Sequence, residues 1–126
     1  MLIEMQGVCK YCGQSAFVEM EEGCDQVAAD RMATRNCMCE GSERENAIMA
    51  ANANLRALAV DNAVDLGYEY ALDSEVVTEL KRIIPLVYDG VFTDVKVMEP
   101  GGDMVQIKQG IRCVAVRRTH KVDRKL

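Results

Sequence analysis

The feature of this sequence that most constrains its fold is a set of four cysteines in two close pairs. The first pair stands in "CKYCGQ", residues 9–14, and the second in "RNCMCEG", residues 35–41. Two thiols at C-x2-C spacing converge when the chain between them forms a tight turn. Gly13 favours that turn because it can adopt a positive φ and leave amide hydrogens facing the sulfurs. The spacing predicts one site made by both pairs: Cys9, Cys12, Cys37 and Cys39.

Four thiolates in a tetrahedron are the ligands that zinc takes most readily in structural sites. Where thiols stay reduced, clustered cysteines are more often metal ligands than disulfides. We therefore expect a structural Zn²⁺, with no open position for water or substrate. A redox or disulfide role and unliganded thiols are the alternatives. Cys24 is a possible substitute ligand, but it lies at the far end of a predicted helix, roughly 18 Å away at 1.5 Å per residue.

The residues around the cysteine pairs predict a hairpin and a helix. Residues 2–8 and 15–20 are expected to form two short strands that flank the first pair. Residues 24–36 show helical spacing of apolar side chains, with Asp25 near the start. Because the second pair begins where this helix ends, both pairs should meet at one end of the head.

The middle of the chain predicts two helices. In the first, residues 41–67, Ser42 is expected as the N-cap, Glu45 completes a capping box and Gly67 ends the helix. The second, residues 73–84, is expected to be stopped or kinked by Pro85. Together they should form a helical hairpin. The positions expected to share one face of the first helix are Ile48, Ala51, Leu55, Leu58 and Asn62. The positions of the second helix expected to face inward are Val76, Val77, Leu80, Ile83 and Ile84.

After Gly90 the apolar residues alternate with a period of two, which indicates strands. Residues 91–99, 104–109 and 111–120, with a turn at 100–103, predict a three-stranded antiparallel meander. Cys113 is expected to be a small core residue of the last strand. The other positions expected to face the core are Val91, Val95, Val97, Val105 and Ile107.

These elements predict an α+β fold with an N-terminal zinc-ribbon-like β-hairpin plus helix, a central helical hairpin and a C-terminal three-stranded antiparallel meander. The expected parts are a zinc-binding head (1–41), the helical hairpin (42–90), the meander (91–118) and a basic tail (119–126). The start of the chain lacks the pattern of a signal peptide, and no uncharged apolar stretch reaches the roughly 18 residues of a membrane span. We expect a cytoplasmic protein without membrane contact.

Charge is distributed unevenly along the chain, whose formal net charge is −5. Residues 106–126 carry seven basic side chains and one acidic one, whereas the rest of the chain is strongly acidic. A basic end of this kind often meets an anionic partner, although a solvated tail is an equal alternative. The residues that would contact nucleic acid are Arg112, Arg117, Arg118, Lys121, Arg124 and Lys125.

No catalytic arrangement is visible in the sequence. The segment "PGGD" lacks the Lys-Ser/Thr of a phosphate-binding loop, and His120, the single histidine, has no cysteine or carboxylate at ligand spacing. The pairs of acidic residues are more simply explained as solvated faces of helices and loops. We therefore expect a protein that is not an enzyme.

The chain resembles a group of small hypothetical proteins of bacteriophages and prophages of Gram-positive bacteria. The resemblance lies in "CKYCGQ" (9–14), "DQVAADRMATRNCMC" (25–39) and the closing strands "VKVMEPGGDMVQIKQGIRCVAVRRTHK". It implies a zinc-ribbon-like head and no known activity. The positions that it implies as metal ligands are Cys9, Cys12, Cys37 and Cys39.

Three functional interpretations follow. The first is a zinc-stapled protein that binds another protein, such as an acidic inhibitor of a bacterial nucleic-acid enzyme or defence nuclease. The second is a nucleic-acid-binding regulator that uses the basic strand and tail; the acidic net charge and the few aromatic residues argue against it. The third, compatible with both, is a homodimer formed through the stripe around Leu55 and Asn62, which approximates a coiled-coil pattern.

Overall fold

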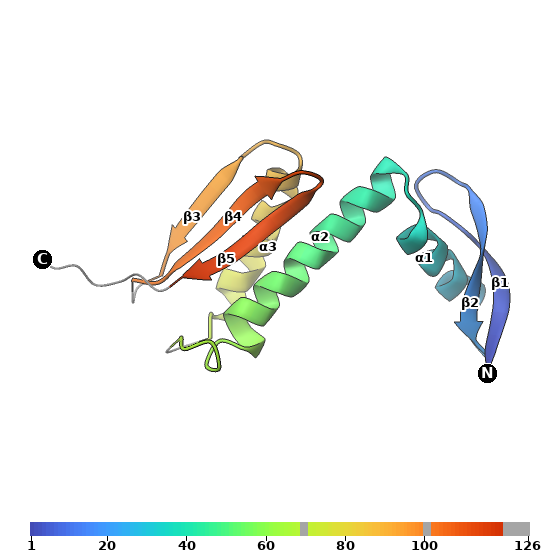
Figure 1. Cartoon of the computed structure of the whole chain (residues 1–126), viewed down its shortest axis with the longest axis horizontal. Helices are drawn as coiled ribbons and strands as arrows, with labels where there is room; N and C mark the ends of the chain where they lie inside the picture. Colours follow the sequence, from blue (N-terminus) through green and yellow to red (C-terminus); the bar gives the residue numbers. More distant parts are fainter. Residues whose placement is uncertain (69–70, 100–101, 120–126) are drawn as a thin grey trace, which may run out of the picture. The chain divides into compact units, whose positions relative to one another are not determined.

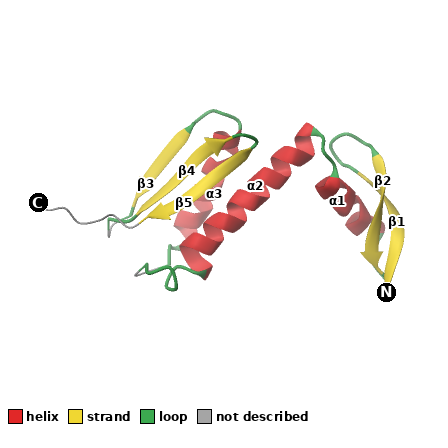
Figure 2. Cartoon of the chain, viewed as in Figure 1, coloured by secondary structure: helices red, strands yellow, loops and turns green. Residues whose placement is uncertain are grey.

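The computed structural model describes residues 1–68, 71–99 and 102–119. The chain divides into two compact units, Met1–Asn46 (the N-terminal unit) and Ala47–Leu126 (the C-terminal unit). The elements are labelled in Figure 1 and coloured by type in Figure 2. They are β1 (Leu2–Val8), β2 (Ser15–Glu21), α1 (Gln26–Asn36), α2 (Glu40–Arg56), a π-helical turn η1 (Ala57–Asp61), α3 (Ser74–Tyr88), β3 (Asp94–Met98), β4 (Met104–Gly110) and β5 (Cys113–Thr119).

The predicted α+β class is confirmed: a hairpin comes first, helices follow, and a three-stranded antiparallel sheet comes last. Among the helices in the described ranges, none combines the length and apolar character needed to cross a membrane. His120 and the remainder of the predicted tail lie outside the described residues.

The N-terminal unit is a two-stranded hairpin with helix α1 packed on one face (Figure 1). Its small core contains Val18, Met20, Ala29 and Ala33. Gly7 allows the close packing, because a Cβ at this position would lie 2.2 Å from the carbonyl oxygen of Ala29. Helix α1 is capped by Asp25, whose carboxylate accepts the amide hydrogen of Ala28 at 2.9 Å. A side chain larger than hydrogen at position 7 would therefore push the helix off the hairpin.

Helix α2 begins earlier than the sequence predicts. It starts at Glu40, and the carbonyl of Cys39 accepts the amide hydrogen of Glu43 at 2.9 Å. Cys39 thus occupies the position that was expected for Ser42, and the prediction of Ser42 as the N-cap is wrong. The predicted capping box is absent as well, because the Glu45 carboxylate is paired with Lys10. The Ser42 side chain is buried instead and faces two cysteine sulfurs.

The core of the C-terminal unit follows a helical stripe that shifts after Leu55. Ala51, Leu55, Ala59 and Ala63 are buried, whereas Asn62, which was expected on the same face as Ala51 and Leu55, is exposed. The reason is the π-helical turn η1, which has more residues per turn than an α-helix and moves the inward position from Leu58 to Ala59. Of the stripe that suggested a coiled-coil dimer, Ala51 and Leu55 are therefore packed in the core of their own unit, whereas Asn62 is not.

Helix α3 continues through Pro85 and ends at Tyr88, so of the two effects expected of Pro85, a stop or a kink, the stop is wrong. Val87, in the added turn, is fully buried and joins Leu80 and Ile84 in the core. The burial of this extra apolar residue compensates for the hydrogen bond that proline cannot donate. Val76, expected to face inward, is exposed.

The sheet has the order β3–β4–β5, and its inner face packs against α3 and the residues of α2 and η1 that share the core. Val105 and Ile107 are buried as expected, and Val95 and Val97 are partly buried, but Val91 precedes the first strand and is exposed. Cys113 is exposed, so its assignment to the core is wrong.

Strand register explains the position of Cys113. Val116 pairs with Ile107 and Arg118 pairs with Val105, so even-numbered residues of β5 share the inner face with the core residues of β4. The odd-numbered Cys113 then points outward. The turn between β4 and β5, in which Arg112 has φ 56°, sets this register.

Candidate metal centre

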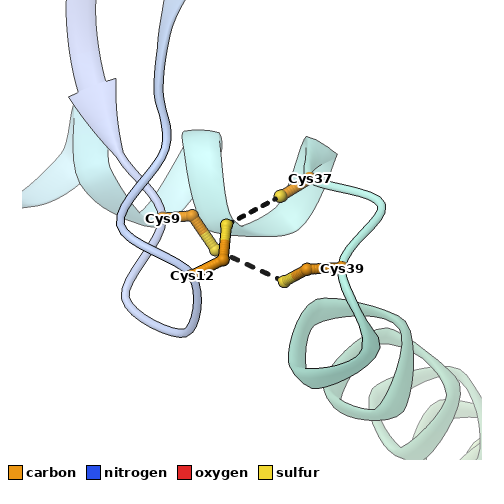
Figure 3. A group of neighbouring side chains, drawn as sticks. All are labelled: Cys9, Cys12, Cys37 and Cys39. Atoms are coloured by element: carbon orange, nitrogen blue, oxygen red, sulfur yellow. Dashed lines mark hydrogen bonds between the residues drawn. The ribbon is translucent and has the colours of Figure 1, made fainter.

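The four predicted cysteines lie together in the N-terminal unit (Figure 3). Cys9 and Cys12 come from the turn after β1, Cys37 follows α1, and Cys39 precedes α2. Their sulfur atoms all lie within 4.8 Å of one another. Two turns that are far apart in the sequence thus bring four potential metal ligands to one point, as the spacing predicts.

The first turn has the form expected of a C-x2-C half-site. Gly13 has φ 76°, and its amide donates to the carbonyl of Cys9 at 2.9 Å. The amide hydrogens of Tyr11 and Cys12 point to the sulfur of Cys9. The amide of Gln14 points to the sulfur of Cys12. These backbone dipoles stabilise negative charge on sulfur, which is the form that binds metal.

The second half-site is placed by the end of one helix and the start of the next. The amide of Cys37 donates to the carbonyl of Thr34 as α1 ends. Cys39 stands at the N-terminus of α2, where unpaired amide hydrogens and the helix dipole favour a thiolate. The Ser42 amide hydrogen-bonds the Cys39 sulfur directly. A C-x-C pair therefore reaches one metal because each cysteine belongs to a different helix terminus.

Ser42 is also a component of the site. This role was missed in the sequence because Ser42 was expected to be a helix cap. Its hydroxyl oxygen lies 3.2 Å from the sulfur of Cys9 and 3.3 Å from that of Cys39. The Ser42 hydroxyl, followed by the amides of Cys12 and Tyr11, lowers the pKa of Cys9 to about 6 despite burial. The same serine lowers the pKa of Cys39. Its position three residues after Cys39 is the sequence signal that could have revealed this role.

Cys12 differs from these two thiols. The Gln14 amide lowers its pKa, but the hydrogen bond with Cys37, burial and the two other thiols outweigh that effect and raise the pKa to about 11. In this arrangement, ionisation is therefore favoured at the two sulfurs beside Ser42 over Cys12. A divalent cation would remove this difference because it favours the thiolate at every ligand position.

The spacing of the sulfurs fits a tetrahedral zinc ion. With a Zn–S bond of about 2.3 Å, two sulfurs on one tetrahedron are about 3.8 Å apart. The Sγ–Sγ distance is 3.8 Å for Cys9 and Cys39 and 3.5 Å for Cys12 and Cys37. Both distances are far longer than the roughly 2.05 Å bond of a disulfide. The donor set and its dimensions are thus compatible with one bound metal ion.

A polar clamp holds the first turn against the start of α2. The Tyr11 hydroxyl donates to the Glu45 carboxylate, and the Lys10 ammonium pairs with the same carboxylate at 3.0 Å. The Tyr11 ring lies on Gly41, where a Cβ would come within 2.5 Å of a ring carbon. Hydrogen bonds from Tyr11 and Lys10 lower the pKa of Glu45. The clamp keeps the two half-sites in register without adding a ligand.

The remaining cysteines do not join the site. Cys24 lies against the small core of the N-terminal unit and is not part of the sulfur cluster. Cys113 belongs to the other unit and is exposed on β5. The ligand set inferred from spacing is therefore the set that the described part of the chain brings together.

The basic residues proposed for nucleic-acid contact are divided by the structure. Arg117 is exposed on β5, and Arg112 is exposed in the turn before it. Arg118 is buried: its guanidinium donates to both oxygens of Glu99, at 2.7 and 3.0 Å, and lies over the Tyr68 ring. Arg118 therefore stabilises the fold and cannot reach a solvent-borne ligand. The predicted contacts at Lys121, Arg124 and Lys125 lie outside the described residues.

Comparison of the chain with models of protein families, with curated proteins and with solved structures finds no match. The interpretation of the site consequently rests on its own geometry and chemistry.

Proposed function

We propose that this protein is a non-enzymatic interaction protein whose N-terminal unit is folded by one structural Zn²⁺. The observation that carries the metal assignment is the convergence of four sulfurs within 4.8 Å. Thiolate is a soft ligand, and a tetrahedral set of four selects zinc or iron–sulfur chemistry over magnesium or calcium. Four protein ligands fill the coordination sphere of zinc, which supports a structural role.

The metal would supply stability that this unit lacks. Its core contains only two large buried side chains, Val18 and Met20, together with two alanines. Burying each large side chain contributes about 1.5–3 kcal/mol. Structural zinc contributes about 10–16 kcal/mol in zinc-finger peptides at neutral pH. We therefore infer that metal binding, more than the apolar core, folds residues 1–46.

Elemental analysis of the purified protein tests the metal assignment. We expect one zinc per chain, and a loss of zinc and of the thermal transition of the N-terminal unit in Cys37→Ser. Cys24→Ser is the matched control, because Cys24 lies outside the sulfur cluster, and it should retain the metal. A protein without stoichiometric metal, whose melting curve does not change with a chelator, would refute the assignment.

The proposed interaction surface is the outer face of the β1–β2 hairpin. Phe17 is 71% exposed there, opposite Gln6. Glu4 and Glu19 stand directly opposite each other on the same face. Glu21, two residues after Glu19 on β2, has its side chain on this face as well. Like charges directly opposite are destabilising in a sheet. An exposed aromatic ring among carboxylates fits a protein partner that offers an apolar pocket bordered by lysine or arginine.

The resemblance to phage proteins extends this proposal to a setting. A phage-borne protein would act in the cytoplasm of the bacterial host, and an acidic face could occupy the nucleic-acid site of a host enzyme or defence nuclease. The four zinc-bound thiolates would add a net charge of about −2 and strengthen this acidic character. The acidic hairpin face supports this extension, and the identity of the partner is left to experiment.

Affinity capture with the metal-loaded protein tests the surface. Protein captured from a bacterial lysate should be lost with Phe17→Ser and with Glu19→Lys, since both side chains point away from the core. Val64→Ser, also an exposed apolar residue but in the other unit, should leave capture unchanged. Equal capture by all variants, or none by the parent protein, would contradict the proposal.

Homodimerisation stays a prediction that light scattering can test.

A further inference from the structure

The outer face of the three-stranded sheet concentrates positive charge in an acidic protein. Lys96 on β3, Gln106 on β4 and Arg117 on β5 form one cross-strand row. The next row contains Asp94, Lys108 and Ala115. The lysines and the arginine are exposed, and the opposite face of the sheet packs on the core. Three cations thus share a face that no described element of the C-terminal unit covers.

These cations lack acidic partners within the described ranges. Ion pairs of Met1, Lys10, Arg56, Arg82 and Arg118 are found there, and none of these includes a cation of the outer face. The one carboxylate on the two rows, Asp94, stands opposite Lys108 and accepts a hydrogen bond from Gln106 at 2.9 Å. The two rows therefore carry three cations against one anion, and this excess of positive charge is available to an external anion.

The small side chain of Ala115 leaves a hollow between the cations. It has a volume of about 80 Å³ and is lined by Gln106, Lys108, Ala115 and Arg117. An arginine fork and a lysine ammonium on either side of such a hollow are suited to phosphate oxygens. The two rows contain no aromatic or large apolar side chain, which a protein partner would use as an anchor.

We propose that this outer face, Lys96, Lys108 and Arg117 with Gln106, binds the phosphodiester backbone of nucleic acid. Neighbouring strands are about 4.8 Å apart, so the row from β3 to β5 spans roughly 10 Å. On each strand of B-DNA one phosphate charge follows another about every 3.4 Å of helix axis, so three cations within this span lie close enough together for each to contact a phosphate of one short stretch of backbone. Without an aromatic side chain in the two rows, the face contacts phosphates and does not stack bases.

This face differs from the one that the sequence suggested. Arg118 is withdrawn into the core, and Lys96 and Lys108 take its place because strand pairing sets them beside Arg117. The inference concerns the C-terminal unit and does not depend on the proposed metal or on the hairpin face. Failure of the phosphate-binding proposal would therefore leave the proposed function intact. Failure of the proposed function would likewise leave the phosphate-binding proposal intact.

Fluorescence anisotropy with a labelled oligonucleotide and the full, metal-loaded chain tests the proposal. Binding through three phosphate contacts predicts a slope of log K against log salt of about −2 for single strands, so a fourfold rise in salt should weaken binding roughly 15-fold. Single-stranded and duplex DNA form separate arms, and binding in either arm supports the proposal. No binding at low salt in both arms would overturn it.

The variants separate this face from general charge effects. The triple variant Lys96→Gln, Lys108→Gln, Arg117→Gln should abolish most of the binding and of the salt dependence. The single variant Arg117→Gln should reduce the slope by about 0.7. A control with the same charge change elsewhere, Arg56→Gln, Lys81→Gln, Arg82→Gln, should bind as the parent does. Equal loss in both triple variants, or equally effective competition by polyglutamate, would refute a phosphodiester site.

Discussion

Replacing Arg118 by methionine should destabilise the C-terminal unit strongly, although the same change at its neighbour Arg117 should not. The side chain of Arg118 is 2% exposed and that of its partner Glu99 is 12% exposed. The guanidinium also donates to the carbonyl of Leu58, within the π-helical turn, at 3.2 Å and lies 4.0 Å from the centre of the Tyr68 ring. One side chain thus connects β5 with η1, with the loop that follows η1, and with Glu99, the residue after β3.

The expected loss follows from the groups left behind. Removing one partner of a buried ion pair costs about 3–5 kcal/mol, because the other charge stays buried without compensation. The carbonyl of Leu58 would also lose its donor. Methionine keeps the apolar length of the side chain, so little of the loss comes from a cavity. In the double variant Glu99→Met, Arg118→Met, no buried charge is left, and most of the stability should return.

Native-state hydrogen exchange of the β4 amides measures this loss, since these amides exchange through unfolding of the sheet. Arg117→Met is the matched control, because Arg117 is exposed on the outer face, and it should change the free energy of unfolding by less than about 0.5 kcal/mol. A loss below about 1 kcal/mol for Arg118→Met, or no recovery in the double variant, would refute the reasoning.

Two further predictions concern the N-terminal unit. Gly7→Ala should destabilise it by at least about 2 kcal/mol, because the new Cβ would lie 2.2 Å from the backbone oxygen of Ala29. Calorimetry of the metal-loaded protein should show a lower melting temperature for this unit alone. An unchanged melting temperature would contradict the close packing of α1 on the hairpin at Gly7. Removal of zinc should unfold this unit and return the pKa of Cys9, which the fold lowers from 9.0 to about 6 chiefly through Ser42, to its ordinary value. The metal-free protein should therefore show no thiolate absorbance step near pH 6. A step near pH 6 that disappears in Cys9→Ser would show that the unit keeps its fold without metal, which would contradict the proposed role of the metal.

Local features of the chain were predictable where one short segment contains the whole cause. The tight turn between Cys9 and Cys12 follows from Gly13, and the start of α1 follows from the carboxylate of Asp25. The two strands around the first pair were also located correctly, because alternation of apolar residues depends on nothing outside the strand.

Predictions failed where a distant residue decides between two local options. Ser42 has the residue type and spacing of a helix cap, yet its hydroxyl lies against sulfurs supplied partly by the turn after β1. Pro85 is a helix breaker by local rules, but burial of Val87 extends the helix past it. In both cases a tertiary contact is worth more than the local preference.

The amino-acid pattern of β5 alone establishes that Arg117 and Arg118 point to opposite faces, since side chains alternate along a strand. It leaves open which of the two points inward. Pairing with β4 places Arg118 on the core side, and Glu99, Leu58 and Tyr68 supply the partners that allow a charge to be buried there. Because a buried charge is stable only with such partners, and these come from three other parts of the chain, tertiary structure determines which arginine supports the fold and which can meet a ligand.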